Sequence, residues 1–297
     1  MIARPLSLML MLCFIGVFAQ IAQANARLTI YTVNYPLQYF AQRIAGEKAE
    51  VVFPAPKNID PAFWSPDAKT IHAYQTADLI LLNGANYAKW INKISLPRLR
   101  MVNTSRAFEK KYIQVQSGVT HSHGAGPDHS HTGIAFTTWL DMSLAIQQAE
   151  AIKNALIKKQ PKFEAEFITN FKNLKNDLLM LDTELKKITK KNMNLNLFSS
   201  HPVYQYLANR YELNLQSVVW EPDVLPGPEE WKIFERKLQA HPATWMIWEA
   251  PPKNETLMWL RKVGINSLIF NPCANVPEAG DFLTVMHSNI SELKRAY

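Results

Sequence analysis

The amino-acid sequence predicts an α/β protein of two lobes, each with a parallel sheet flanked by helices, joined by a long rigid α-helix. Three observations lead to this fold class. Strand-like and helix-like segments alternate on both sides of residues 143–191, apolar residues recur at helical spacing within that stretch, and 297 residues with 47% hydrophobic content are enough for two cores. Alternating strands and helices are typical of a parallel sheet covered on both faces.

The chain is expected to divide into four segments. Residues 1–26 form a signal peptide, residues 27–142 an N-terminal α/β lobe, residues 143–191 the connecting helices and residues 192–297 a C-terminal α/β lobe. A basic residue, an apolar run and small residues indicate the signal peptide: Arg4, Leu6–Ala19, Ala22, Ala24 and Ala26. We therefore expect export to the periplasm, with cleavage near Ala24 or Ala26.

In the N-terminal lobe the pattern predicts three strands and two helices. The strands are Leu28–Val33, Val51–Phe53 and Asp78–Leu82, and the helices are Leu37–Ala45 and Asp67–Ala77. Gly46 ends the first helix, because glycine readily adopts the backbone conformation that terminates helices. Asn83-Gly84 provides the turn after the third strand.

The connecting stretch contains two expected helices, Ser143–Lys159 and Pro161–Lys190. Proline suits the first turn of the second helix, because its missing N–H would have no partner there. Apolar residues lie three and four apart on one face of that helix: Phe163, Phe167, Phe171, Leu174, Leu178, Leu181, Leu185 and Ile188. At ~1.5 Å rise per residue the helix would extend about 45 Å, so we expect it to join two bodies.

In the C-terminal lobe the alternation returns. The expected strands are Leu195–Phe198, Leu215–Trp220, Thr244–Trp248 and Ser267–Phe270, and the expected helices are Val203–Tyr211, Pro228–Ala240, Asn254–Val263 and Ser288–Ala296. Ligands of open parallel sheets bind beyond the carboxyl ends of the strands. The polar residues just past these strands are His201, Glu221, Glu249 and Asn271, which makes them the pocket candidates of this lobe.

A histidine-rich stretch, residues 121–131, precedes the connecting helices. It contains His121, His123, Asp128, His129 and His131. Gly124, Gly126 and Pro127 disfavour regular structure, which predicts a mobile surface loop. Imidazole suits Zn²⁺ and other transition metals, and short histidine-rich tracts indicate metal handling.

The net charge of +7 does not by itself indicate nucleic-acid binding. Ten lysines and five acidic residues lie between Lys153 and Lys191, spread around the polar side of the predicted helices. This arrangement favours a solvated helix face over a phosphate-binding patch, so we expect no nucleic-acid partner. The chain also lacks a Gly-x-Ser-x-Gly elbow, a phosphate-binding glycine loop and a His-Glu-x-x-His helix, which argues against an enzyme.

Motifs along the whole mature chain resemble those of the periplasmic solute-binding proteins of zinc and manganese ABC transporters, the zinc-uptake type. Asp60-Pro61-Ala62 resembles that family's Asp-Pro-His loop, and Trp139-Leu140-Asp141 its Trp-Leu-Asp motif. The remaining matches are His201 with Tyr204 and Tyr206 to His-x-x-Tyr-x-Tyr, Glu249-Ala250-Pro251 to Glu-Pro, and Asn271-Pro272 to Asp-Pro. The resemblance implies a bilobal metal-binding protein that serves a permease in the inner membrane.

The resemblance also implies a metal site that this chain has largely lost. In that family three histidines and one carboxylate hold the metal in the cleft. Their positions fall on Ala62, Thr137, His201 and Asn271, so only His201 keeps a family ligand. Since a tight Zn²⁺ site needs about four basic ligands, His201 alone cannot hold zinc tightly.

Three interpretations stay open at this point. In the first, His121, His123, His129 and His131 complete a shell with His201, and with Glu249 or Asp60, around Zn²⁺, Mn²⁺ or another divalent transition metal. In the second, the cleft binds a non-metal or chelated-metal solute against Trp64, Trp139 and Trp220. In the third, the chain is an accessory periplasmic metal chaperone. Cys273 is either a buried thiol or a soft-metal ligand, and the protein is expected to be a monomer.

Overall fold

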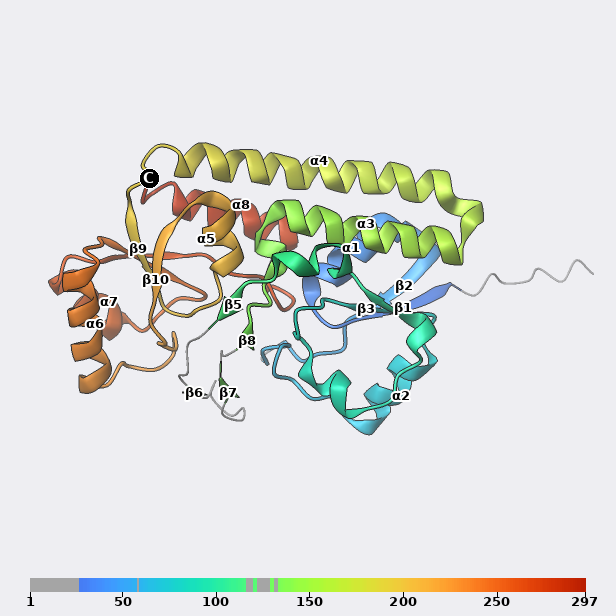
Figure 1. Ribbon diagram of the computed structural model, residues 1–297, viewed down its shortest axis with the longest axis horizontal. Coiled ribbons are helices and arrows are strands. Elements are labelled where there is room, and N and C mark those ends of the chain that lie inside the picture. Colours follow the sequence, from blue (N-terminus) through green and yellow to red (C-terminus); the bar gives the residue numbers. More distant parts are fainter. Residues whose placement is uncertain (1–26, 58, 116–119, 122–128, 131–132) are drawn as a thin grey trace, which may run out of the picture.

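The computed structural model describes residues 27–57, 59–115, 120–121, 129–130 and 133–297. It contains two four-stranded parallel sheets, each flanked by helices, and one long helix that runs across both (Figure 1). The predicted fold class is therefore confirmed. The expected signal peptide lies outside the described residues, and no described helix has the length and apolar character needed to cross a membrane.

The first sheet has the strand order β2-β1-β3-β4, with every neighbouring pair parallel. Its strands are β1 (Leu28–Thr32), β2 (Ala49–Val52), β3 (Leu79–Leu82) and β4 (Met101–Asn103), and its helices are α1 (Tyr35–Ala45) and α2 (Ala68–Thr76). Strand β4 was not predicted, because three half-buried residues are too few to show a period. β4 is a strand because it pairs with β3, and its own three residues do not indicate this.

The second sheet repeats this arrangement with the order β10-β9-β11-β12. Its strands are β9 (Asn196–Ser199), β10 (Asn214–Ser217), β11 (Trp245–Trp248) and β12 (Asn266–Ile269), and its helices are α5 (Gln205–Tyr211), α6 (Pro228–Ala240), α7 (Asn254–Lys262) and α8 (Phe282–Leu293). The last helix begins six residues earlier than the predicted Ser288. Asp281 caps it by accepting a hydrogen bond from the Thr284 backbone N–H at 2.9 Å.

The connecting segment is a pair of adjacent helices, α3 (Met142–Lys159) and α4 (Glu164–Thr189), with a 3₁₀ turn at Pro161–Phe163 between them. Of the predicted apolar stripe, all but Phe163 is buried. The first half of α4 packs against α1, where Arg43 pairs with Asp177 at 2.6 Å, and its second half contacts α5 and α8. One continuous helix therefore touches both lobes.

Ion pairs and hydrogen bonds around Asp182 fix α4 to the second lobe. Asp182 of α4 accepts two hydrogen bonds from Arg210 of α5, both at 3.0 Å, and one from Tyr211 at 3.1 Å. Arg210 also lies 3.5 Å from Asp141, the residue that caps α3. Burial raises the pKa of Asp182, but Arg210 and Lys186 outweigh it and hold that pKa below its usual value.

Short antiparallel strands flank the histidine-rich stretch. Strand β5 (Gln114–Val115) pairs with β8 (Gly133–Ile134), and β6 (Thr120–His121) pairs with β7 (His129–Ser130). The expectation that this stretch has no regular structure is therefore wrong at both of its ends. The strands form because the segments before and after the stretch pair through their backbones, and neither segment has a strand pattern in its own sequence. Residues 122–128 and 131–132 lie outside the described part of the chain.

Candidate functional site

The candidate site forms where three neighbouring strands of the second sheet end. His201 follows β9, Glu221 follows β10 and Glu249 follows β11, and β9 lies between the other two in the sheet. Because the carboxyl ends of parallel strands meet at one edge, the imidazole is placed between the two carboxylates. His201 Nε2 lies 3.1 Å from Glu221 Oε1, and Nδ1 lies 3.4 Å from Glu249 Oε1.

The backbone around the imidazole is held by both neighbouring strands. The Ser200 N–H donates to the Ile247 carbonyl at 2.9 Å, and the Trp220 N–H donates to the Ser200 carbonyl at 2.8 Å. The Ser199 hydroxyl donates to the carbonyl of His201 itself at 2.9 Å. These bonds extend the sheet past β9, so the imidazole is fixed on a rigid element and fully buried.

The two carboxylates face water to different extents. The side chain of Glu221 is 14% exposed and that of Glu249 is 28% exposed, whereas His201 is 1% exposed. Tyr204 is buried beside this group, and burial together with the Glu249 carboxylate raises the pKa of Tyr204 well above its usual value of 10.0. Its hydroxyl therefore stays protonated, and it donates to the Phe270 carbonyl at 2.7 Å.

This group can act on a cation in one specific way. The two ring nitrogens point in different directions, so a metal ion on one nitrogen leaves the carboxylate at the other nitrogen as an orienting partner. A carboxylate that accepts from a metal-bound imidazole fixes its ring and raises its basicity. Within the described ranges, no group of three or more histidine, cysteine, aspartate or glutamate side chains is arranged to hold a metal ion by itself.

The other three positions at which the resemblance places metal ligands are engaged in structural contacts. Ala62 is buried, and its backbone N–H donates to Asp60 Oδ1 at 2.9 Å. The Thr137 hydroxyl donates to the carbonyl of Val203, across the lobe boundary, at 2.5 Å. Asn271 uses its side-chain oxygen to accept from the Cys273 N–H at 2.7 Å.

A strap of the second lobe, residues 271–276, reinforces the lobe contact. Trp139 Nε1 of the first lobe donates to the Pro272 carbonyl at 2.7 Å, and the Tyr35 N–H donates to the Ala274 carbonyl at 3.0 Å. The Asn275 side chain donates to the carbonyls of Pro56 and Ile59 at 2.7 and 2.8 Å. The two lobes are thus held together by protein hydrogen bonds.

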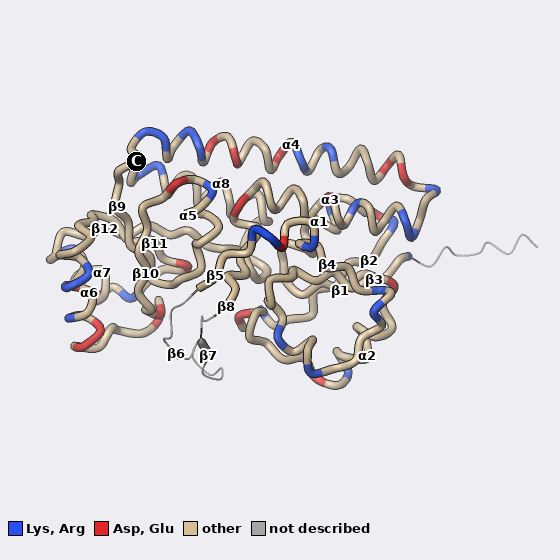
Figure 2. The backbone as a smooth tube through the Cα atoms, viewed as in Figure 1, with Lys and Arg blue, Asp and Glu red and all other residues tan. Residues whose placement is uncertain are grey.

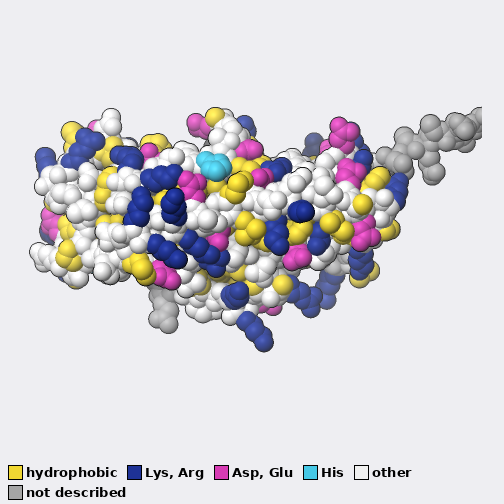
Figure 3. Space-filling view, turned by 90° about the horizontal axis from the view of Figure 1, so that it is seen from above, with side chains coloured by type: hydrophobic (Ala, Val, Ile, Leu, Met, Phe, Trp, Pro, Cys, Tyr) yellow, Lys and Arg dark blue, Asp and Glu magenta, His cyan; other side chains and the backbone are white. Residues whose placement is uncertain are grey.

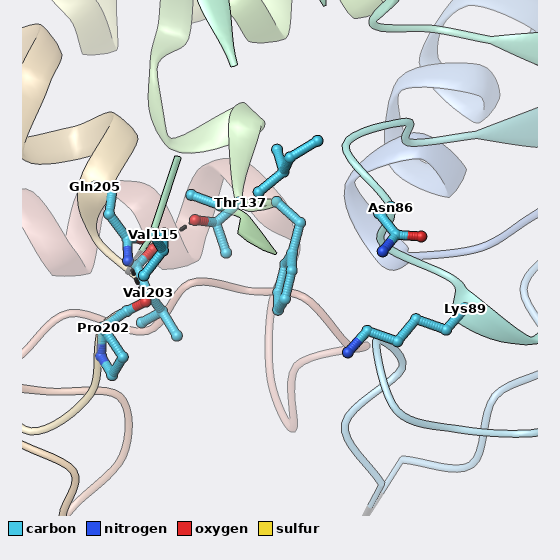
Figure 4. Close-up of a pocket in the computed structure, with 10 residues that line it drawn as sticks. Asn86, Lys89, Val115, Thr137, Pro202, Val203 and Gln205 are labelled. Carbon is cyan, nitrogen blue, oxygen red and sulfur yellow. Dashed lines mark hydrogen bonds between the residues drawn. The ribbon is translucent and has the colours of Figure 1, made fainter. Parts of the chain in front are cut away.

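A small pocket lies between the lobes beside Thr137 (Figure 4). Asn86 and Lys89 line it from the first lobe, and Pro202 and Gln205 line it from the second. Its volume of about 20 Å³ has room for little more than one water molecule. It therefore cannot hold an organic solute.

The tryptophans do not form the walls that one sequence interpretation required. Trp139 is fully buried, and Trp220 is 4% exposed and stacks on Trp231 with ring centroids 5.4 Å apart. Trp64 is half-buried and packs edge-on against Trp90. None of the three is among the residues that line the pocket between the lobes.

The remaining sequence candidates are placed as follows. His121 and His129 belong to the paired strands β6 and β7, whereas His123 and His131 lie outside the described residues. Cys273 is 2% exposed, and burial, with a smaller contribution from Asp281, raises its thiol pKa to about 12. It is therefore a buried, protonated thiol. The sequence placed Glu221 at a strand end but gave it no role, because its contact with His201 depends on strand order.

Comparisons with curated proteins identify relatives across most of the chain. The zinc-binding lipoprotein AdcA of Streptococcus pneumoniae is 22% identical over 282 residues, which cover 92% of this chain and 56% of AdcA. The metal ABC transporter substrate-binding lipoprotein SsaB of Streptococcus sanguinis is 24% identical, with 96% of each chain covered. The chain spans little more than half the length of AdcA, and nearly all of SsaB.

Solved structures share the fold. The metal-dependent lipoprotein YcdH of Bacillus subtilis superposes with a TM-score of 0.77 at 20% identity, covering 91% of this chain and 99% of YcdH. Zn(II)-bound AdcA of Streptococcus pneumoniae gives a TM-score of 0.75 at 20% identity, covering 91% of this chain and 57% of AdcA. The profile of the family described as ZnuA, zinc-uptake complex component A periplasmic, matches residues 30–296. The resemblance drawn from the motifs is confirmed, and this chain belongs to that zinc-uptake family.

Proposed function

We propose that this chain is the periplasmic substrate-binding component of a metal-ion ABC uptake system, with Zn²⁺ as its cargo and Mn²⁺ as the second candidate. Family membership over residues 30–296 supports this role, as do the zinc-binding and metal-transporter names of its relatives. The observation that carries the proposal is His201, held between two carboxylates at the ends of three adjacent strands. Turnover of a substrate is not part of this role.

In this proposal His201 binds the cation through one ring nitrogen, and the carboxylate at the other nitrogen orients it. Imidazole is a preferred ligand of Zn²⁺, and Glu221 and Glu249 supply negative charge close to the ion. This charge replaces the carboxylate missing at Asn271. We assign the remaining ligands to His121, His123, His129 and His131. Of these, His121 and His129 belong to β6 and β7, which lie on the side of the molecule opposite α4 (Figure 1).

Delivery to an inner-membrane permease, with a monomeric protein as the carrier, completes the proposed role. The continuous helix α4 and the strap favour small adjustments over a wide opening of the lobes. Bending α4 would break its backbone hydrogen bonds, and moving the lobes apart would break those of Trp139 and Asn275. We therefore propose that the cation leaves through side-chain movement at the cleft.

An accessory metal chaperone is the second candidate. It is favoured by Ala62 and Thr137, which are used for packing and for the lobe contact and bring no donor to a shared ion. A chaperone would take metal on the histidine-rich stretch and give it to another protein without a tight cleft site. The two candidates differ in whether His201 is needed for binding.

Zinc and manganese titration of residues 27–297 by calorimetry and metal analysis separates the two. For the uptake role we expect one Zn²⁺ per chain, and at least a roughly 100-fold loss of affinity on His201→Ala. The exposed His287 of α8 provides a matched control, and His287→Ala should bind as the parent does. If deletion of residues 121–131 removes all binding and His201→Ala removes none, the chaperone role is correct. If no metal is retained through dialysis, both roles fail.

A further inference from the structure

The outward face of α4 has an unusual balance of charge. From residue 168 to residue 193 the exposed charged side chains are Lys172, Lys175, Lys187, Lys190 and Lys191, whereas the first turn of α4 also exposes Glu164 and Glu166. The three carboxylates of the same stretch are each held in an ion pair. Asp177 pairs with Arg43, Asp182 with Arg210 and Glu184 with Lys294. Beyond the first turn of α4, the exposed charge of this face is therefore positive.

Apolar side chains stand among these lysines. Ile168 is 46% exposed, Leu179 41%, Met180 58% and Met193 56%. Seen from the α4 side, the surface shows basic side chains gathered in groups with hydrophobic ones between them (Figure 3). Figure 2 shows basic residues gathering towards the C-terminal end of α4. Lysines around exposed apolar residues on one helix face are typical of helices that lie on an anionic membrane surface.

A groove between α4 and α8 lies at the same end. Leu179, Met180 and Ile188 supply its apolar lining, and Lys187 and Lys191 its basic groups. Glu184 and Lys294 also line it, but they pair with each other at 2.5 Å. Its volume is about 560 Å³, far larger than the pocket between the lobes. A groove with this combination suits a molecule that has an apolar part and an anionic head.

We propose that the α4 face of this protein docks on a membrane that contains anionic phospholipid, with a lipid in the α4–α8 groove. The exposed lysines extend over about 28 Å at ~1.5 Å per residue, which fits a flat, extended partner better than a single pocket. All five are lysines, so the face lacks the fork geometry with which arginine binds carboxylates of a peptide in pairs. An anionic bilayer needs only point charges and apolar anchors.

Vesicle binding of residues 27–297, which contain all the described structure, tests this proposal. Sedimentation with vesicles of phosphatidylglycerol and phosphatidylcholine is compared with pure phosphatidylcholine, in the presence of a chelator so that no metal bridges protein and lipid. We expect binding to the anionic vesicles alone, weakening as salt is raised from 50 to 500 mM. The triple variant Lys187→Glu, Lys190→Glu, Lys191→Glu should lose at least roughly 100-fold in partitioning.

A control with the same net charge isolates the face from the overall charge. Lys69, Lys93 and Arg98 are exposed on the first lobe, and their triple change to glutamate should leave most of the binding intact. The variant Leu179→Ser, Met180→Ser keeps every charge and should still weaken binding. Thermal unfolding confirms that each variant folds.

Two results would overturn the proposal. In one, both triple variants lose binding equally, which would make it an effect of net charge. In the other, vesicles do not bind but an acidic polypeptide such as polyglutamate binds and is lost in the α4 variant, which would make the partner a protein. Zinc affinity is measured in parallel. Because the α4 face does not include His201, the outcome of the vesicle test is independent of the metal-uptake role.

Discussion

The edges of the two sheets that face the cleft differ in what their loops do. In the second lobe, the strand ends carry His201 with a carboxylate on each side, and the backbone that holds the imidazole is bonded to both neighbouring strands. In the first lobe, the positions at which the motif resemblance places metal ligands carry a buried methyl group at Ala62 and a hydroxyl at Thr137 that bonds to the other lobe. The second lobe keeps groups that can bind a metal ion, and the first lobe supplies a hydrogen bond that holds the lobes together.

This difference separates two tasks that a cation shared between lobes would perform together. Such a cation both binds donors and joins the lobes. Here the joining is done by Thr137, Trp139 and the strap, through hydrogen bonds that need no ligand. The position of the lobes should therefore depend little on whether metal is present, while metal affinity should depend on the second lobe and on the histidine-rich stretch.

The largest effect is expected at the two carboxylates. Glu249→Gln and Glu221→Gln each keep the shape of the side chain but remove the charge beside the imidazole, so each should lower Zn²⁺ affinity by about 10- to 100-fold. Chelator competition measures this. Glu235→Gln, at an exposed carboxylate on α6 of the same lobe, provides a control. Unchanged affinity in both site variants would remove the second lobe from metal binding.

The ion pair of Asp182 should have an effect of similar size, on folding stability. Asp182→Asn weakens the charged hydrogen bonds from Arg210, and we expect a loss of about 1.5–3 kcal/mol in the free energy of unfolding at pH 7. The folded pKa of Asp182 is depressed, so its stabilisation is present above the usual value of 3.8 and is lost as pH falls through the folded pKa. Denaturation at pH 7 and below pH 3 should therefore show the difference between parent and variant narrowing in acid.

Removal of the indole donor tests the strap. Trp139→Phe leaves the buried Pro272 carbonyl without this donor and should cost about 1–2 kcal/mol in urea unfolding. Trp259→Phe, at a half-buried ring on α7, should cost less. Equal losses in the two variants would mean that packing of the ring dominates and that the hydrogen bond between lobes adds nothing.

The smallest effect is expected at Thr137. Thr137→Val is nearly the same shape and loses only the hydroxyl that bonds to the Val203 carbonyl, so we expect about 1 kcal/mol of destabilisation. Zn²⁺ affinity should stay within about twofold of the parent value, because this side chain bonds to the other lobe and does not bind the metal ion. A large drop in affinity would show that the threonine oxygen is a ligand, and the contrast between the lobes would then be wrong.

Elements whose signals are local could be predicted from the order of the amino acids alone. The stripe from Phe163 to Ile188 was readable because seven of its eight apolar positions are buried on one face, and β11 showed as a short apolar run. The strand predicted at Leu215–Trp220 extends three residues beyond the end of β10. Position past a strand end was enough to select His201, Glu221 and Glu249 as candidates, since carboxyl ends of parallel strands meet at one edge. It was not enough to say which of them touch.

Contacts between residues far apart in the chain could be found only from the folded arrangement. The bond from Thr137 to Val203 spans 66 residues and that from Trp139 to Pro272 spans 133, and no local pattern encodes such a pairing. The two-residue strands β5 to β8 exist only because their partners face them. Which charges of α4 remain exposed likewise depends on which of its carboxylates form ion pairs with basic side chains in the folded chain. Composition supplies the groups, and the packing of the elements determines which of them remain available to a ligand.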